Sequence, residues 1–209
     1  MRTLLAARFL SILRYNRLMR RPLLTAASAF IGLAILISST QFTTGQSNQQ
    51  KDAPAKESAP DVPDAITVPA GVEPVLFARG KGTQIYTCQA DAEGKFSWTL
   101  KGPDAELKDR KDKVIGQHSI GPTWKLKDGS EVTGKAIAHV ESLDPDSIPW
   151  LLVNVVNNAG KGALASVTTI QRVHTHGGKP GSDPCDQSHK DAVTKSDYTA
   201  DYYFFAPTK

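Results

Sequence analysis

The feature that most constrains the fold is a two-residue alternation of apolar and polar side chains in short runs. In KFSWTL, Phe96, Trp98 and Leu100 fall on one face, and in TWKLKDGSEV, Trp124 and Leu126 alternate with lysines. Successive side chains of a strand point to opposite faces of a sheet, so this period predicts strands with one buried face.

Further runs rich in β-branched and aromatic residues are separated by Gly and Pro turn signals; they are GKAIAHV, WLLVNVV, ASVTTIQRV and YTADYYFF. Asp128-Gly129 is a strong hairpin dipeptide. The charged piece DAELKDRKDK (104–113) predicts a helical turn or a loop. Many short strands predict an all-β domain over residues 66–209, either an antiparallel β-sandwich or a single barrel-like domain.

Residues 1–40 predict a signal peptide or a membrane anchor. Six arginines and no acidic residue precede the apolar run PLLTAASAFIGLAILISST, which is the pattern of a secretory signal. Uncleaved, residues 22–42 are long enough to anchor the chain in the inner membrane. Either case predicts an exported domain, secreted into the periplasm or the extracellular space.

Residues 41–65 are polar and rich in Gln, Ser, Ala and Pro. Such a composition buries too little apolar surface to fold, so it predicts a disordered linker.

Charge and missing motifs exclude several classes of function. The net charge is +4, but without the six leader arginines 19 basic residues face 21 acidic ones, a net charge of about −2. The domain therefore lacks the basic footprint of a nucleic-acid-binding protein. No G-x-S-x-G, P-loop or G-x-G-x-x-G motif occurs, so neither a cofactor nor an NAD- or ATP-dependent enzyme is expected.

Cys88 and Cys185 are the two cysteines of the chain. In an exported domain an even pair predicts a structural disulfide, with two buried free thiols as the alternative. A bridge closing so long a loop contributes about 4–5 kcal/mol in the chain-entropy model.

His174 and His176 are two residues apart, and on a strand they point to the same side, as a metal site requires. The alternative is an exposed polar strand end without metal. A third ligand is available from several residues, none at a diagnostic spacing: His118, His139, His189, Asp183 and Asp186.

Four further residues are candidates for binding. His118 lies between glycines in VIGQHSIGPTW, where it serves either as a ligand contact or general base, or as a partner for buried backbone groups. Trp124 and Trp150 fit either a binding cleft or the core, whereas the strand position of Trp98 favours the core. Arg172 completes a possible metal-free site with His118 and Trp124.

Several segments resemble, in order over about residues 66–206, the exported bacterial and fungal domain-of-unknown-function family number three-four-five-five. They are PAGVEPVLFARGKGTQIYTCQA, IGQHSIGPTWKLKDGSEVTGK, IPWLLVNVV, VTTIQRVHTHGG and YTADYYFF. The resemblance implies a secreted, β-rich domain with no established activity. His174 and His176 depart from the family pattern, which more often has Asn in place of the first histidine. The matching positions are Cys88, His118, Gly121, Pro122, Trp124, Pro149, Trp150, Gln171, Arg172, Gly177, Gly178, Cys185, Tyr198, Ala200 and Asp201.

A compact β domain without an assembled catalytic constellation predicts a non-catalytic binding or envelope-associated module. Its partner would be a small molecule, a glycan or an envelope component. The alternatives are a metal-dependent enzyme or metal-binding protein using His174 and His176, and a metal-free site around His118.

Overall fold

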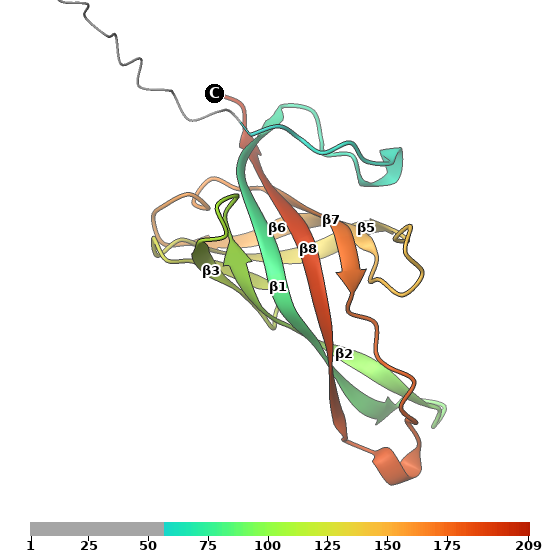
Figure 1. The fold of residues 1–209 in the computed structure, drawn as a ribbon. Coiled ribbons are helices and arrows are strands. Elements are labelled where there is room, and N and C mark those ends of the chain that lie inside the picture. The colour runs from blue at the N-terminus through green and yellow to red at the C-terminus, as the bar shows by residue number, and fades with distance from the viewer. Residues whose placement is uncertain (1–56) are drawn as a thin grey trace, which may run out of the picture. The chain divides into compact units, whose positions relative to one another are not determined.

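A computed structural model describes residues 57–209, which form one antiparallel sheet closed into a barrel (Figure 1). The all-β prediction is confirmed, and of the two expected architectures the structure has the barrel. The strands follow one another around the barrel in chain order, and β1 pairs with β8. They are β1 (Val72–Ala90), β2 (Phe96–Lys108), β3 (Val114–Ser119), β4 (Thr123–Leu126), β5 (Glu131–Val140), β6 (Trp150–Ala159), β7 (Thr169–Gly177) and β8 (Val193–Pro207).

The closing pair is the longest in the sheet. Its register runs from Val72 opposite Pro207 to Thr87 opposite Val193. Figure 1 shows the far ends of β1, β2 and β8 continuing together beyond the barrel as an arm. Strand closure leaves no unpaired edge and creates an interior whose side chains alternate with outward ones.

Side chains of strand β8 are buried on both the inner and the outer face of the barrel. Tyr202 and Phe204 belong to the interior core, whereas Tyr203 and Phe205 belong to a second cluster on the outer face. The run YTADYYFF lacks a simple polar alternation because both of its faces are buried at this end of the strand.

A segment preceding β1 covers this outer cluster. It contains a short 3-10 helix, η1 (Asp64–Ile66), where Ile66 is fully buried and its carbonyl accepts a hydrogen bond from Gln171 Nε2 at 2.7 Å. Residues 57–65 belong to the segment that we expected to be a linker. Here Val62 packs on the outer cluster and Glu57 pairs with Arg110.

Two local predictions had opposite outcomes. The hairpin at Asp128-Gly129 is confirmed, because Gly129 has φ of 88° between β4 and β5. The helical turn or loop expected over 104–113 is wrong for its first half, since residues 104–108 continue β2. Ala105 and Leu107 point into the core between charged outward neighbours, so the period is two.

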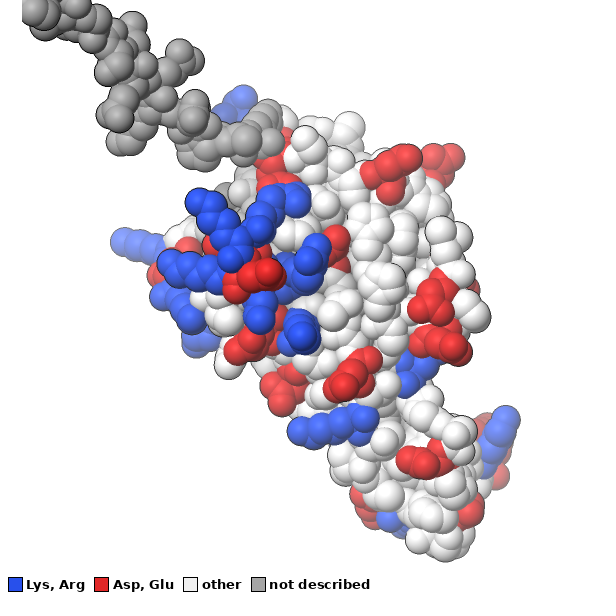
Figure 2. Space-filling model, viewed as in Figure 1, with Lys and Arg blue, Asp and Glu red and all other residues white. Residues whose placement is uncertain are grey.

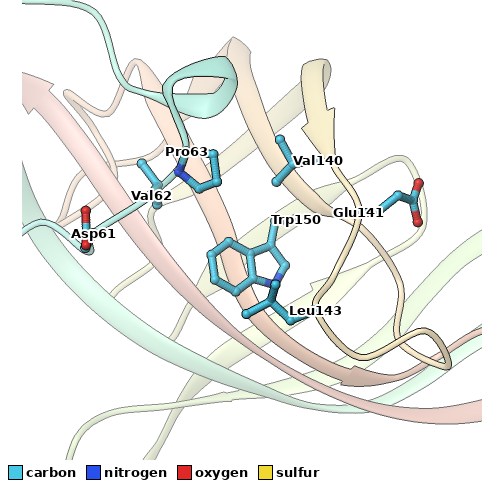
Figure 3. A pocket seen from close by; sticks show the side chains of 7 residues that line it. All are labelled: Asp61, Val62, Pro63, Val140, Glu141, Leu143 and Trp150. Carbon is cyan, nitrogen blue, oxygen red and sulfur yellow. The ribbon is translucent and has the colours of Figure 1, made fainter.

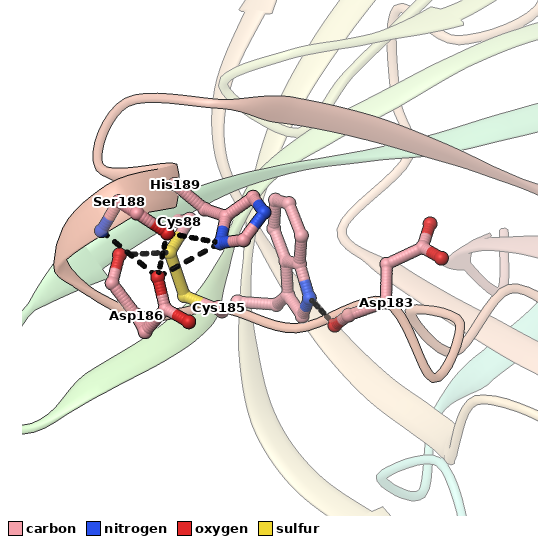
Figure 4. The surroundings of a disulfide bond; sticks show 7 residues. Cys88, Asp183, Cys185, Asp186, Ser188 and His189 are labelled. Atoms are coloured by element: carbon pink, nitrogen blue, oxygen red, sulfur yellow. Dashed lines mark hydrogen bonds and ion pairs between the residues drawn. A yellow bond between two sulfur atoms is a disulfide. The ribbon is translucent and has the colours of Figure 1, made fainter.

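The predicted disulfide is present, with Cα atoms of Cys88 and Cys185 5.4 Å apart (Figure 4). It ties the connection before β8 to β1 in the arm. Trp98, expected in the core, is instead partly exposed on the arm, and its indole N–H donates to the Asp183 carbonyl at 2.9 Å. A second 3-10 helix, η2 (Gln187–His189), follows the bridge.

The predicted signal peptide or anchor (1–40, or 22–42) lies outside the described residues. Within residues 57–209, no helix is long and apolar enough to cross a membrane.

Replacing both cysteines, Cys88→Ala with Cys185→Ala, should lower the free energy of unfolding by up to about 4–5 kcal/mol, because the bridge joins residues 97 positions apart. Denaturant titration measures this loss. Dithiothreitol should destabilise the native protein to a similar extent and leave the double variant unchanged. Equal stability of both proteins without reductant would contradict the structural role.

Candidate functional site

Three of the predicted site residues meet in one cavity inside the barrel, with a volume of about 320 Å³. His118 comes from β3, Trp124 from β4 and Arg172 from β7. Gln84 of β1 and Tyr202 of β8 complete the polar and aromatic lining. The remaining lining is largely apolar, as in most small-molecule sites.

His118 and Trp124 form a stacked pair, because the β3–β4 register places them opposite each other. Their ring centroids are 4.2 Å apart with an interplanar angle of 10°, and Tyr202 meets both rings edge-on. His118 Nδ1 lies 2.9 Å from the Thr123 carbonyl oxygen. The carbonyl accepts only, so Nδ1 carries the proton and Nε2 is left as an acceptor.

Burial lowers the pKa of His118 from 6.5 to about 3; the Thr123 carbonyl opposes this shift and the Arg172 charge adds to it. The imidazole is therefore neutral at physiological pH. A group with so low a pKa is a weak general base, since efficient bases have a pKa near the working pH.

Two glycines make room for the large rings. A Cβ on Gly134 would lie 3.1 Å from Trp124, and one on Gly80 would lie 2.6 Å from Tyr202. Both glycines are buried inside the barrel wall. The absence of their side chains lets two aromatic residues fit beside a cavity in a small barrel.

Arg172 brings a positive charge into the cavity. Its Nε and Nη2 both donate to the Pro149 carbonyl, at 3.2 and 2.7 Å. The described lining of the cavity contains no Asp or Glu. Burial raises the pKa of Tyr202, and the Arg172 charge partly opposes that shift. The two family-pattern residues Pro149 and Arg172 thus contact each other directly.

Gln84 and Trp124 carry buried polar atoms without protein partners. Gln84 is 1% exposed, and neither its amide nitrogen nor its amide oxygen is hydrogen-bonded within the described residues. The indole nitrogen of Trp124 is also unpartnered. Each such group costs about 1–3 kcal/mol unless a ligand or water satisfies it.

Exposed lining residues mark the rim of the cavity. Lys101 and Gly121 are exposed lining residues at the rim, and Gly102 is a buried lining residue next to Lys101. Gly102 has φ of 142°, and a Cβ there would lie 3.0 Å from the Cα of Ile120. A Cβ on Gly178, which lies outside the lining, would be 3.3 Å from Gln84 Cγ, so the glycine turn packs against the side chain of Gln84.

Trp150, the fourth predicted binding residue, lies elsewhere. It lines an outer groove of about 380 Å³, where Figure 3 shows its indole between Leu143 and the Val62–Pro63 segment. Its ring packs edge-on against His174, with centroids 5.1 Å apart. Trp150 therefore belongs to the outer cluster and does not join the barrel cavity.

His174 and His176 are both exposed and line one surface hollow, as their spacing predicted. His174 has φ of 48° at a bulge, and its Nδ1 lies 3.1 Å from Asp201 Oδ2. The hollow is also lined by Arg79 and two lysines, in the region where Figure 2 shows basic side chains gathered. Among the described residues no group of three metal-binding side chains occurs.

A Ser-His-Asp group on η2 does not have catalytic geometry. Ser188 Oγ donates directly to Asp186 Oδ1 at 2.6 Å, and His189 Nδ1 lies 2.8 Å from the same oxygen (Figure 4). A catalytic triad places the histidine between the serine and the carboxylate. Here the Asp186 carboxylate caps the short helix instead.

The fold and cavity define a class of protein: a small, closed, antiparallel barrel whose interior cavity has mostly apolar walls and a few polar groups. A family model for a protein of unknown function, DUF3455, matches residues 69–206. The chain belongs to this family. No curated protein and no solved structure matches it.

Sequence reasoning missed Gln84 and Tyr202 as cavity residues. Gln84 could have been noticed as a large amide side chain within TQIYTC, a run whose other residues are typical of a buried strand. Nothing in YTADYYFF distinguished Tyr202, which points inward, from Tyr203, which points outward.

His118→Phe should remove an acid sensitivity of stability while keeping the stack on Trp124. Below pH 6.5 the unfolded chain binds a proton at His118, whereas the folded chain does not until pH is about 3. Native stability should therefore fall on acidification through this window, by up to about 1.4 kcal/mol per pH unit from this residue.

Denaturant titrations between pH 7 and pH 4.5 measure the slope, in a range above the ordinary pKa of carboxylates. The exposed His139 provides a matched control, since His139→Phe should retain the native slope. An unchanged slope in His118→Phe would show that the buried imidazole is not the source.

Proposed function

We propose that the protein is a non-catalytic binding module that holds a small, mostly apolar molecule inside its barrel. The observation that carries the proposal is the cavity in which His118, Trp124 and Arg172 meet, with unpartnered polar atoms on Gln84 and Trp124. A ligand would fill the apolar volume and satisfy those atoms at once. The volume of about 320 Å³ falls within the range of small-molecule sites.

The state of His118 supports binding over catalysis. Its ring is neutral, stacked and hydrogen-bonded through Nδ1, so it is held for positioning and contributes little as a base. The described lining also lacks a carboxylate that could act as its partner.

The arrangement of Trp124 favours a small molecule over a glycan. One face of its indole is already covered by His118. The ring is also 2% exposed, whereas sugar-binding aromatic rings present an accessible face to the ligand.

Export and an envelope location form part of the proposal. The Cys88–Cys185 bridge is of a kind that persists in oxidising compartments. The leader arginines and apolar run support secretion, with membrane attachment through residues 22–42 if the leader is retained.

Ala136→Phe should block the cavity. Ala136 lines the cavity yet is exposed to solvent, so a larger ring can extend into the opening. We expect the neutral apolar dye N-phenylnaphthylamine to bind the native protein saturably with enhanced fluorescence. The variant should bind the dye at least about tenfold more weakly, since the ring occupies its space.

Lys135→Phe is the matched control, because Lys135 is the exposed neighbour on the same strand and lies outside the cavity lining. It should bind the dye like the native protein. The proposal fails if the native protein does not bind the dye, or if both variants bind it equally well.

A further inference from the structure

The polar groups of the cavity differ in the kind of partner they need. Arg172 and the indole nitrogen of Trp124 can only donate hydrogen bonds, and the amide nitrogen of Gln84 is a further donor. The free acceptors are the amide oxygen of Gln84 and Nε2 of His118. Among these four residues Arg172 carries the charge, and that charge is positive.

The Arg172 charge has no acidic partner in the described lining. Arg172 donates to the neutral carbonyl of Pro149 and interacts with the Tyr202 hydroxyl, and neither partner carries a negative charge. A charge held inside an apolar site without a counter-charge is costly, and a ligand anion would remove that cost. Guanidinium groups also match the geometry of carboxylates.

The number of charges favours a single negative charge on the ligand. Arg172 is the cation among the inward lining residues, while Lys101 is exposed at the rim. A phosphate monoester would bring a second negative charge with no second buried cation to meet it. Lys101 instead suits the attraction of an anion towards the opening.

The rest of the lining requires an apolar body. Leu100, Pro103, Pro122, Leu151 and Val153 line the cavity together with the aromatic rings. Such walls offer no hydrogen bonds from their side chains and gain by excluding water.

We infer that the ligand is a small carboxylic acid with an apolar body, whose carboxylate is received by Arg172 and Gln84 inside the barrel. This inference rests on the proposed function, because it assigns the chemistry of the same cavity. It predicts a preference for a carboxylate over an otherwise identical neutral molecule.

Calorimetric titration of the full-length protein with octanoate, octanol and octyl phosphate tests the inference. The native protein should bind octanoate at least about tenfold more tightly than octanol, as expected for a charge paired in a buried site. Arg172→Gln should reduce this ratio to near one, because octanoate binding is weakened far more than octanol binding. Octyl phosphate should bind more weakly than octanoate.

Arg79→Gln is the matched control, since it removes the same charge from the outer surface, where Arg79 pairs with Asp201. It should retain the native ratio. If Arg172→Gln does not fold, Gln84→Leu serves instead, and it should weaken octanoate binding several-fold more than octanol binding.

The outcomes separate the two proposals. Equal binding of octanoate and octanol by the native protein would overturn the carboxylate inference and leave the cavity-binding function standing. Tighter binding of octyl phosphate would overturn the choice of a single charge. Absence of binding by all three would count against both, as would octanol binding that Ala136→Phe leaves unchanged.

Discussion

The pairing of β1 with β8 closes the sheet, and the buried groups described above owe their positions to that closure. Gln84 of β1 and Tyr202 of β8 reach the same cavity because their strands adjoin at the seam. The cavity is thus assembled from residues that are more than a hundred positions apart. Closure also removes the sheet edges, so the wall can keep a hollow interior without exposing unpaired backbone.

The electrostatics of the interior follow from the same enclosure. Burial keeps His118 neutral, and the nearby Arg172 charge adds to the effect, so the two basic side chains do not repel each other as paired cations would. The guanidinium of Arg172 supplies a positive charge in the same cavity. The cavity therefore has one lasting charge among groups that stay neutral. This combination distinguishes it from the outer hollow of His174, where several basic side chains are exposed to solvent and salt around a partly buried Asp201.

Local sequence patterns predicted the features that depend mainly on neighbouring residues. The alternation around Trp124, the turn at Asp128-Gly129 and the Cys88–Cys185 pair were all readable, because each depends on neighbouring residues or on compartment chemistry. The strand at 104–108 was missed because its outward side is charged, which obscured the inward positions of Ala105 and Leu107.

The position of each tryptophan depends on tertiary packing: Trp124 is in the interior, Trp150 in an outer groove and Trp98 on the arm. His118 and Arg172 come together only when the barrel closes, so their proximity could not be predicted from local sequence. Gln84 lies in no recognisable motif, so its role in the cavity could not be predicted either.

The contact between Gly102 and Ile120 at the rim has a consequence for selectivity. Gly102 of β2 and the turn between β3 and β4 approach so closely there that a single methyl group on the glycine would press on the Cα of Ile120. Where Gly102 lines the cavity, the wall is therefore made of main-chain atoms, which yield less readily than flexible side chains. A branched or bulky molecule would press on this stiff part of the wall, whereas a narrow one would pass it. Ligands would then be selected by shape as they enter, independently of their interactions with the polar groups of the cavity.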